Sequence, residues 1–201
     1  MFSTFDETKI RTMKKSILPF ISFLLIFSAC KKNDKILNEE HATGVPTGAS
    51  YCGTPTETRF MAGQSTDVGS VTVWNDQNNV YVNYQTTGNY LLKITHLYVG
   101  LCSAIPVNNS GNPKIGQFPF VNDHGTGVSS FTRVIPRSSL PEGCLCVAAH
   151  AEVVAYNSSG SVVFSQTGWG QGPQITSGGS WAMKFGYCLQ ACLPTGPGGD
   201  R

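Results

Sequence analysis

The chain has 201 residues, with 14 Lys and Arg, 12 Asp and Glu and a formal net charge of +2. Four of the basic and two of the acidic residues precede Cys30, so the chain from Cys30 onward has no net charge. A nucleic-acid-binding protein needs a basic surface and an adsorbed membrane helix needs a basic amphipathic segment, and the sequence shows neither. We therefore expect no nucleic-acid partner.

The chain opens with a segment typical of export. Two lysines precede an apolar run within residues 16–29, which ends in two small residues directly before Cys30. A positive start, a short apolar run and a small-residue end make up a secretory signal, and this run is shorter than the about 20 residues that span a membrane. The sequence predicts a signal peptide at residues 1–29, with Met13 as the true start.

Cys30 makes this segment resemble a bacterial lipoprotein signal. In that family the cysteine after the cleavage site is acylated, with palmitate among the acyl groups, and becomes the first mature residue. Lys31 and Lys32 follow it, as in lipoproteins of the Bacteroidota. The resemblance implies a lipid anchor in the cell envelope at the outer membrane, facing either the periplasm or the outside. The alternative is an ordinary cleaved signal with an incidental thiol at Cys30.

The mature chain divides into three parts. Residues 30–50 are polar and contain Gly and Pro, which predicts a flexible tether after the lipidated cysteine. Residues 51–192 carry the apolar patterning of one domain, large enough to bury a core. Residues 193–201 form a Pro- and Gly-rich tail.

Within the domain, short segments have the composition of β-strands, and the first two alternate between apolar and polar residues. They lie at residues 70–74, 79–84, 91–99, 130–135, 144–156, 161–164 and 181–187. The cluster Asn75–Asn78 predicts a tight turn between the first two. The pattern predicts an all-β fold, an antiparallel β-sandwich with a β-barrel as the alternative. Two connections, 102–128 and 167–180, are too long for tight turns, and such loops are often functional.

Six cysteines follow Cys30, and an even number in an exported chain predicts disulfides. Cys144 and Cys146 lie two apart on one strand, so each is expected to bond elsewhere. A bridge from Cys52 to Cys188 or Cys192 would tie the ends of the domain together. Sequence alone leaves the pairing open, and a zinc site is the rival interpretation. The six are Cys52, Cys102, Cys144, Cys146, Cys188 and Cys192.

No catalytic motif is present, and no cofactor is implied. A glycosidase needs two opposed carboxylates in a cleft, and Asp123 and Glu152 are one conceivable pair without a spacing that indicates it. We expect a protein that is not an enzyme, and a hydrolase ranks last among the hypotheses.

Histidines offer a metal site as a second possibility. His96 and His150 lie in predicted strands, and His150 shares a strand face with Glu152. Together with His124 from the long connection, they would supply three histidines, or two histidines and a carboxylate. The alternative is that His96 and His150 are half-buried sheet residues hydrogen-bonded to the backbone or to Tyr98.

The aromatic residues favour ligand binding. Trp169 lies between two glycines in the second long connection, and Trp181 follows Gly-Gly-Ser. A rigid indole binds the flat face of a sugar ring well, with polar residues such as Gln171 and Asp123 beside it. The sequence therefore predicts a glycan site at Trp169 and Trp181. The alternative is that Trp74, Trp169 and Trp181 plug the ends of the core.

The segments His96–Gly100, Gly116–Pro119, Ala148–Ala151 and Gly168–Gly170 together resemble a family of uncharacterised extracellular β domains in bacterial surface proteins. The resemblance spans about residues 70–187 and implies fold and location only. The leading hypothesis is an envelope-anchored, non-catalytic domain that captures extracellular glycans. A structural or adhesive surface protein with a protein partner is the alternative.

Overall fold

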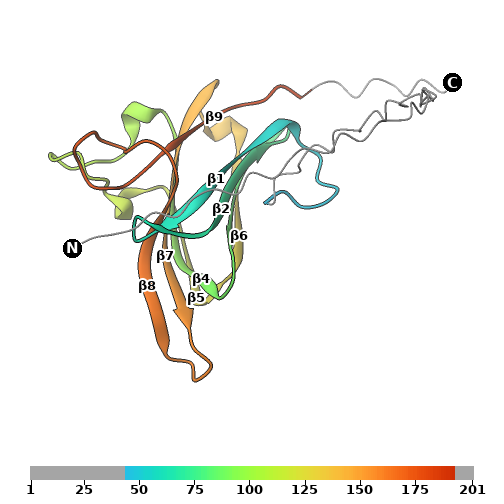
Figure 1. Cartoon of the computed structure of the whole chain (residues 1–201). Coiled ribbons are helices and arrows are strands. Elements are labelled where there is room, and N and C mark those ends of the chain that lie inside the picture. The colour runs from blue at the N-terminus through green and yellow to red at the C-terminus, as the bar shows by residue number, and fades with distance from the viewer. Residues whose placement is uncertain (1–43, 193–201) are drawn as a thin grey trace, which may run out of the picture. The chain divides into compact units, whose positions relative to one another are not determined.

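The computed structural model describes residues 44–192, which form an antiparallel β fold (Figure 1). The predicted all-β class is confirmed. Single turns of 3-10 helix lie at Cys102–Ala104, Ile115–Gln117 and Arg137–Ser139. The strands are β1 Cys52–Ala62, β2 Thr66–Asn75, β3 Asn79–Thr86, β4 Tyr90–Gly100, β5 Phe120–Val128, β6 Ser130–Pro136, β7 Cys144–Tyr156, β8 Val162–Gly170 and β9 Phe185–Cys188.

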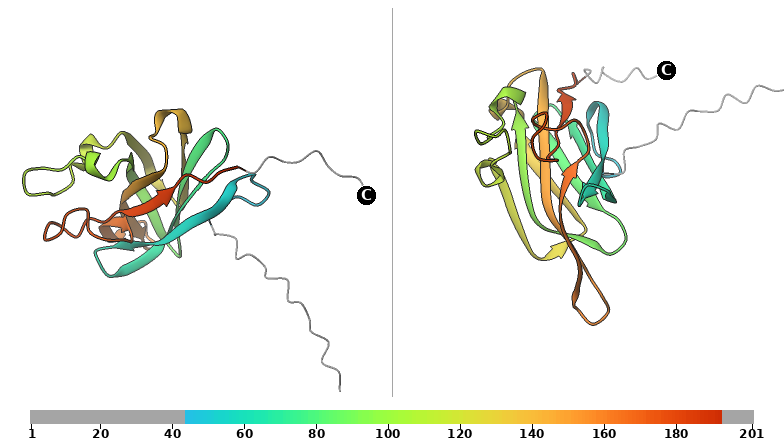
Figure 2. Two further views of the ribbon diagram at one scale, coloured as in Figure 1. Left: turned by 90° about the horizontal axis from the view of Figure 1, so that it is seen from above. Right: turned by 60° about the vertical axis from the view of Figure 1, so that its left-hand side comes forward.

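The strands form one open sheet in the order β5-β4-β7-β8-β1-β2-β3-β6, and β9 pairs with β7. Only three residue pairs join the two halves, where Phe60, Met61 and Ala62 of β1 meet the end of β8. The half β5-β4-β7-β8 lies opposite the half β1-β2-β3-β6 (Figure 2), and buried residues of both belong to one core cluster. The sheet does not close into a barrel, so the sandwich prediction holds and the barrel alternative does not.

Alternation along the central strands builds this core. Val71 and Val73 of β2, and Val80 and Val82 of β3, are fully buried within the core cluster. Their neighbours in sequence point to the outer face, because successive side chains of a strand point to opposite faces. The predicted hairpin between these two strands is confirmed.

Asp76 fixes the turn of this hairpin. Its Oδ1 accepts the backbone N–H groups of Asn78 and Asn79, each at 2.7 Å, and its Oδ2 accepts the hydroxyl of Tyr81 at 2.6 Å. A carboxylate that binds backbone N–H groups two and three residues ahead is a common way to close a turn. The turn cluster at Asn75–Asn78 therefore sets the register of β2 against β3.

Two strands differ from the sequence-based prediction. β5 lies inside the connection predicted at 102–128, and β1 was not predicted at all. Both are rich in polar residues, because β5 lies at the end of the sheet and more than half of β1 is partly buried or exposed. The last strand begins at Phe185 rather than Trp181, and β8 continues to Gly170.

Three disulfides join the six cysteines of the described residues. They are Cys52–Cys192, Cys102–Cys146 and Cys144–Cys188. The predictions that Cys144 and Cys146 bond elsewhere and that Cys52 bonds to one of the last two cysteines are confirmed. Three disulfides indicate an oxidising compartment, either periplasmic or extracellular. Among residues 44–192, no helix has the length and apolar character needed to cross a membrane.

Candidate functional site

Most of the predicted site residues lie on one face, the outer face of β4, β5, β7 and β8. His150 of β7 is paired with His96 on one side and with Trp169 on the other. Two residues further along β7, Glu152 is paired with Ile94, which is also the partner of Asp123. Paired residues of neighbouring strands point to the same face of a sheet. The sheet therefore brings together residues from four separate stretches of the sequence.

Two loops cover part of this face. Residues 101–119 follow β4 and residues 171–184 follow β8, and together with the sheet they form a second apolar cluster outside the core. The Cys102–Cys146 disulfide ties the first loop to β7. The side-chain oxygen of Asn112 accepts the backbone N–H of Ser180 at 2.8 Å and joins the loops to each other.

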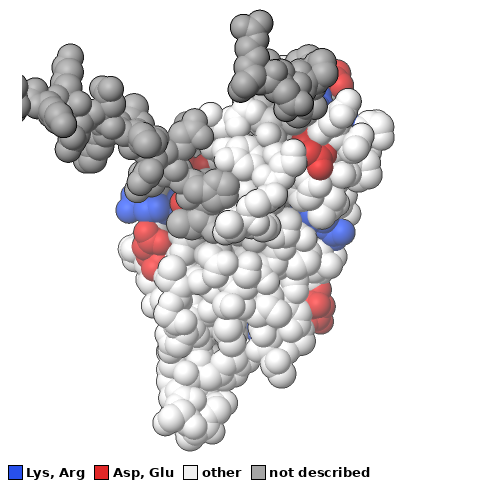
Figure 3. All heavy atoms as spheres, turned by 90° about the vertical axis from the view of Figure 1, so that its right-hand side faces the viewer, with Lys and Arg blue, Asp and Glu red and all other residues white. Residues whose placement is uncertain are grey.

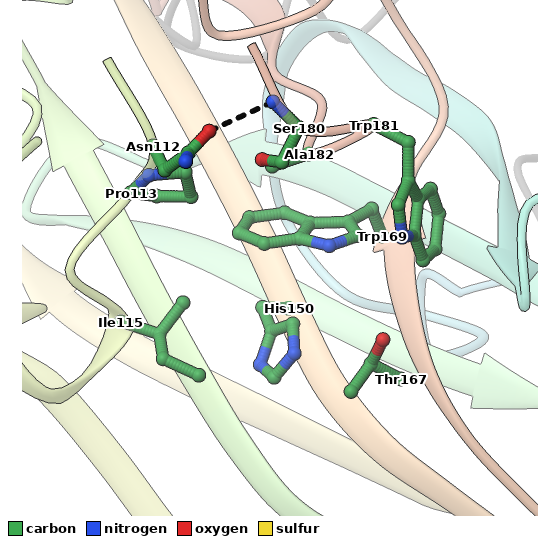
Figure 4. A pocket seen from close by; sticks show the side chains of 9 residues that line it. All are labelled: Asn112, Pro113, Ile115, His150, Thr167, Trp169, Ser180, Trp181 and Ala182. Atoms are coloured by element: carbon green, nitrogen blue, oxygen red, sulfur yellow. Dashed lines mark hydrogen bonds between the residues drawn. The ribbon is translucent and has the colours of Figure 1, made fainter. Parts of the chain in front are cut away.

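A pocket of about 300 Å³ lies where these loops meet the sheet (Figure 4). In Figure 4 the indole of Trp169 is seen between the imidazole of His150 and the hydrogen bond from Ser180 to Asn112, with Trp181 beside it. We call it the loop pocket. Its lining residues are Asn112, Pro113, Ile115, His150, Thr167, Trp169, Ser180, Trp181 and Ala182.

Trp169 is a wall of this pocket and not an exposed platform. It lies on β8 and is 4% exposed. Its ring centroid is 4.7 Å from that of His150 and 6.3 Å from that of Phe118. The prediction that Trp169 stands uncovered on a loop is wrong, because the flanking glycines belong to a strand. Trp181 lies on the loop, is only partly buried and lines the same pocket.

His150 is a neutral polar group in an apolar setting. Burial lowers the pKa of His150 to about 3, and the nearby His96 acts in the same direction. Its Nδ1 is buried and has no hydrogen-bond partner among the described residues. Burial also lowers the pKa of His96, against the opposing effect of Glu152. Both imidazoles are therefore uncharged near neutral pH and can accept a hydrogen bond from a hydroxyl group.

The histidines do not assemble into a metal cluster. Within residues 44–192, no group of three or more His, Cys, Asp or Glu side chains is arranged to hold a metal ion. His96 and His150 are neighbours, with ring centroids 5.4 Å apart, and Glu152 lies one position along the same face. His124 instead lies near Thr95, with Nε2 3.1 Å from the threonine Oγ1, on the opposite face of β4 from His96. The alternation of strand faces separates this third histidine from the other two.

The two polar residues predicted beside the tryptophans lie outside the loop pocket. Gln171 turns toward β1, where its Oε1 accepts the Nε–H of Arg59 at 2.9 Å. Asp123 lies on β5 and accepts the backbone N–H of Gly125 at 2.8 Å. Asp123 and Glu152 are two strands apart, about 10 Å between Cα atoms, and both are exposed. Neither carboxylate lines the loop pocket.

Asn112, Ser180 and Thr167 belong to the pocket but were not predicted from the sequence. All three fall within the predicted connections 102–128 and 167–180, whose composition indicated function without indicating which side chains converge, although Thr167 lies in β8 in the structure. Thr167 is directly paired with Glu152 on β7, a relationship that depends on the register of two strands.

No family model matches the chain, and neither a curated protein nor a solved structure matches it.

Proposed function

We propose that this protein is an envelope-anchored lipoprotein whose β-sandwich binds a neutral saccharide in the loop pocket. The observation that carries the proposal is the combination of two indoles with an uncharged, unpartnered imidazole in one pocket. The ring of Trp181, which is only partly buried, offers an apolar contact to the C–H face of a sugar, and the buried Trp169 forms a wall of the same pocket. His150 and Asn112 offer hydrogen-bonding atoms for hydroxyl groups.

The absence of charge in the pocket supports a neutral ligand. No Lys, Arg, Asp or Glu is among the described residues that line it, and His150 is uncharged at neutral pH. Figure 3 shows a different face of the molecule from the one that bears the two loops, and charged side chains are few and scattered there as well. An ionic ligand would find no counter-charge in the pocket, whereas a saccharide needs none.

Export and lipid anchoring complete the proposal. The signal-like segment and Cys30 lie outside the described residues, and the proposal rests there on the sequence pattern. The three disulfides support export from the cytoplasm, because they require an oxidising compartment. An anchored binding domain would hold its ligand close to the cell.

A glycan array probed with the full chain tests the saccharide assignment. Trp181→Ala should lose binding by about 5- to 150-fold, which corresponds to the about 1–3 kcal/mol of a stacked aromatic contact. Gln171→Ala is the matched control, because Gln171 follows β8 but does not line the pocket. If no array glycan binds, or if Trp181→Ala binds as well as the unaltered chain, the pocket is not a saccharide site.

The burial of Trp169 favours a second candidate, a structural or adhesive protein. A tryptophan that is 4% exposed contributes mainly to packing. The hairpin of β7 and β8 also carries exposed apolar residues, with Val162 at 54% and Val163 at 60% exposure. An exposed apolar edge of this kind suits contact with another protein. If Val163→Lys abolishes cell-surface adhesion while Trp181→Ala does not, the second candidate replaces the first.

A further inference from the structure

A second aromatic group lies on the other half of the sandwich. Trp74 of β2 and Tyr81 of β3 are directly paired, and their rings are stacked with centroids 5.2 Å apart and planes 5° apart. Neither belongs to the two apolar clusters, because both point away from the core. Trp74 is nevertheless only 3% exposed. Another segment of the chain must therefore cover this outward-facing pair.

The covering segment is residues 44–50, which we call the strap. Its Val45 is 4% exposed, and a side chain at Gly44 would collide with Thr72 of β2 and Asn83 of β3. The backbone N–H of Ala49 bonds to the carbonyl of Pro46 at 3.0 Å and turns the strap. The strap therefore packs on the outer face of the sheet that bears the aromatic pair.

The strap does not fill the space above the sheet. A cavity of about 430 Å³ remains, and we call it the strap cavity. Trp74, Tyr81 and Asp76 are among its walls on the sheet side, and Pro46, Ala49 and Ser50 line it on the strap side. It lies on the opposite half of the sheet from the loop pocket and shares no lining residue with it.

The strap cavity carries one negative charge. Burial alone would raise the pKa of Asp76, but hydrogen bonds from Tyr81 and from two backbone N–H groups, together with the positive charge of Arg137, outweigh it and lower that pKa. Asp76 Oδ2 accepts only the Tyr81 hydroxyl among the hydrogen bonds described, so it can accept another. No Lys, Arg or His is among the described residues that line the cavity. Arg137 is close, but it contacts the backbone oxygen of Asp76 at 3.4 Å and pairs with Glu142 at 3.9 Å.

We propose that the strap cavity binds a small, soluble organic cation, an ammonium group on a short apolar body. The ammonium group would lie near Asp76 Oδ2, and its carbon substituents would contact the rings of Trp74 and Tyr81. Aromatic faces attract cations, and the carboxylate of Asp76 adds an attraction between opposite charges that needs no N–H donor. This site is independent of the proposed saccharide function, because its lining residues are different and its proposed ligand is a cation rather than a neutral molecule.

Choline and its uncharged carbon isostere, 3,3-dimethyl-1-butanol, test the charge requirement directly. The two probes have nearly the same shape, so any difference in affinity reports on the positive charge. With the full chain in maltoside detergent, calorimetric titration should show choline binding at least ten-fold more tightly than the isostere. Equal affinity, or no binding of choline, would overturn the proposal.

Two variants locate the binding. Asp76→Asn keeps an Oδ1 acceptor for the turn but removes the charge, and it should weaken choline at least ten-fold. Val134→Lys places an ammonium group at the cavity from a residue that is 48% exposed, and it should block choline without disturbing the fold. Val134→Leu and Trp181→Phe are the controls and should bind choline normally. Unchanged binding by Val134→Lys would overturn the proposal even if Asp76→Asn failed to fold.

The source of the cation is tested separately. The strap encloses the cavity on one side, which favours a free molecule over a lipid head group held in a bilayer. Phosphatidylcholine vesicles at the same head-group concentration should therefore not displace choline. Displacement by the vesicles would overturn the assignment to a soluble ligand.

Discussion

His150 of β7 lies directly opposite His96 of β4, and their ring centroids are 5.4 Å apart. Each has a buried Nδ1 without a hydrogen-bond partner among the described residues. If both rings were protonated, two positive charges would face each other with little water between them. The fold therefore stabilises the uncharged form of both side chains.

This pair should make the protein sensitive to mild acid. Burial lowers the pKa of His150 to about 3, whereas an unfolded histidine has a pKa of 6.5. Below pH 6.5 the unfolded chain takes up a proton that the folded chain does not, so stability is fully present above that pH and falls as the pH falls. The free energy of unfolding should drop by up to about 1.4 kcal/mol per pH unit from this one group.

Urea unfolding between pH 7 and pH 5 measures this slope above the range in which most carboxylates titrate. His150→Gln should flatten it, and His96→Gln should flatten it less, because His96 is more exposed. An identical slope in His150→Gln and the unaltered chain would mean that His150 is protonated in the folded state.

Trp169 and Trp181 should differ in their effect on stability. Trp169→Ala removes a side chain that is 4% exposed and should cost about 3–5 kcal/mol of unfolding free energy. Trp181 is partly exposed, so Trp181→Ala should cost about 1–2 kcal/mol. Denaturant unfolding followed by circular dichroism gives both values. Equal costs would show that the two indoles contribute alike to packing.

Gly69 should tolerate no side chain. Its φ is +145°, and a Cβ there would lie against the backbone carbonyl of Gln85 on β3. Gly69→Ala should therefore destabilise the fold by more than about 2 kcal/mol. Gly186→Ala is the matched control, because a Cβ at that strand position would meet no atom within 4 Å. Similar melting temperatures for the two variants would contradict the tight packing at Gly69.

Cys30→Ser tests the proposed lipid anchor. Because residues 16–29 are too short to remain as a spanning helix, loss of the acylated cysteine should release or mislocalise the protein. Labelling of cells with a radioactive fatty acid should mark the unaltered protein and not the variant. Equal labelling of both would exclude acylation at Cys30.

The sequence predicted best those strands that point alternate residues into the core. β2 and β3 carry regular apolar alternation because one of their faces is buried by the opposite half of the sheet, whereas β7 is a long apolar run that is buried on both faces. β1 and β5 are too polar to show it, and they were missed. The position of Cys52 near the start of the domain predicted a bridge to Cys188 or Cys192 without choosing between them, and the other two bridges depend on strand register.

The candidate site was harder to predict because its glycines were misinterpreted. Gly168 and Gly170 suggested a loose loop around Trp169, but both lie in a strand. A Cβ at Gly168 would come within 2.8 Å of the Phe60 ring, and one at Gly170 within 2.8 Å of the Phe185 ring. These glycines allow close packing rather than flexibility. A single sequence does not distinguish a glycine that gives a loop its flexibility from a glycine that allows close packing in a strand.

The bridge between Cys52 and Cys192 also determines how the domain would carry a mechanical load. Their Cα atoms are 4.5 Å apart, and the residues between them form one covalently closed loop. Tension applied through the chain before Cys52 and after Cys192 passes through the sulfur–sulfur bond, so the sandwich itself bears none of it. The strap at residues 44–50 lies outside that closed loop. A pull from the N-terminal side would therefore peel the strap from β2 and β3 and uncover Trp74 while every strand stayed folded.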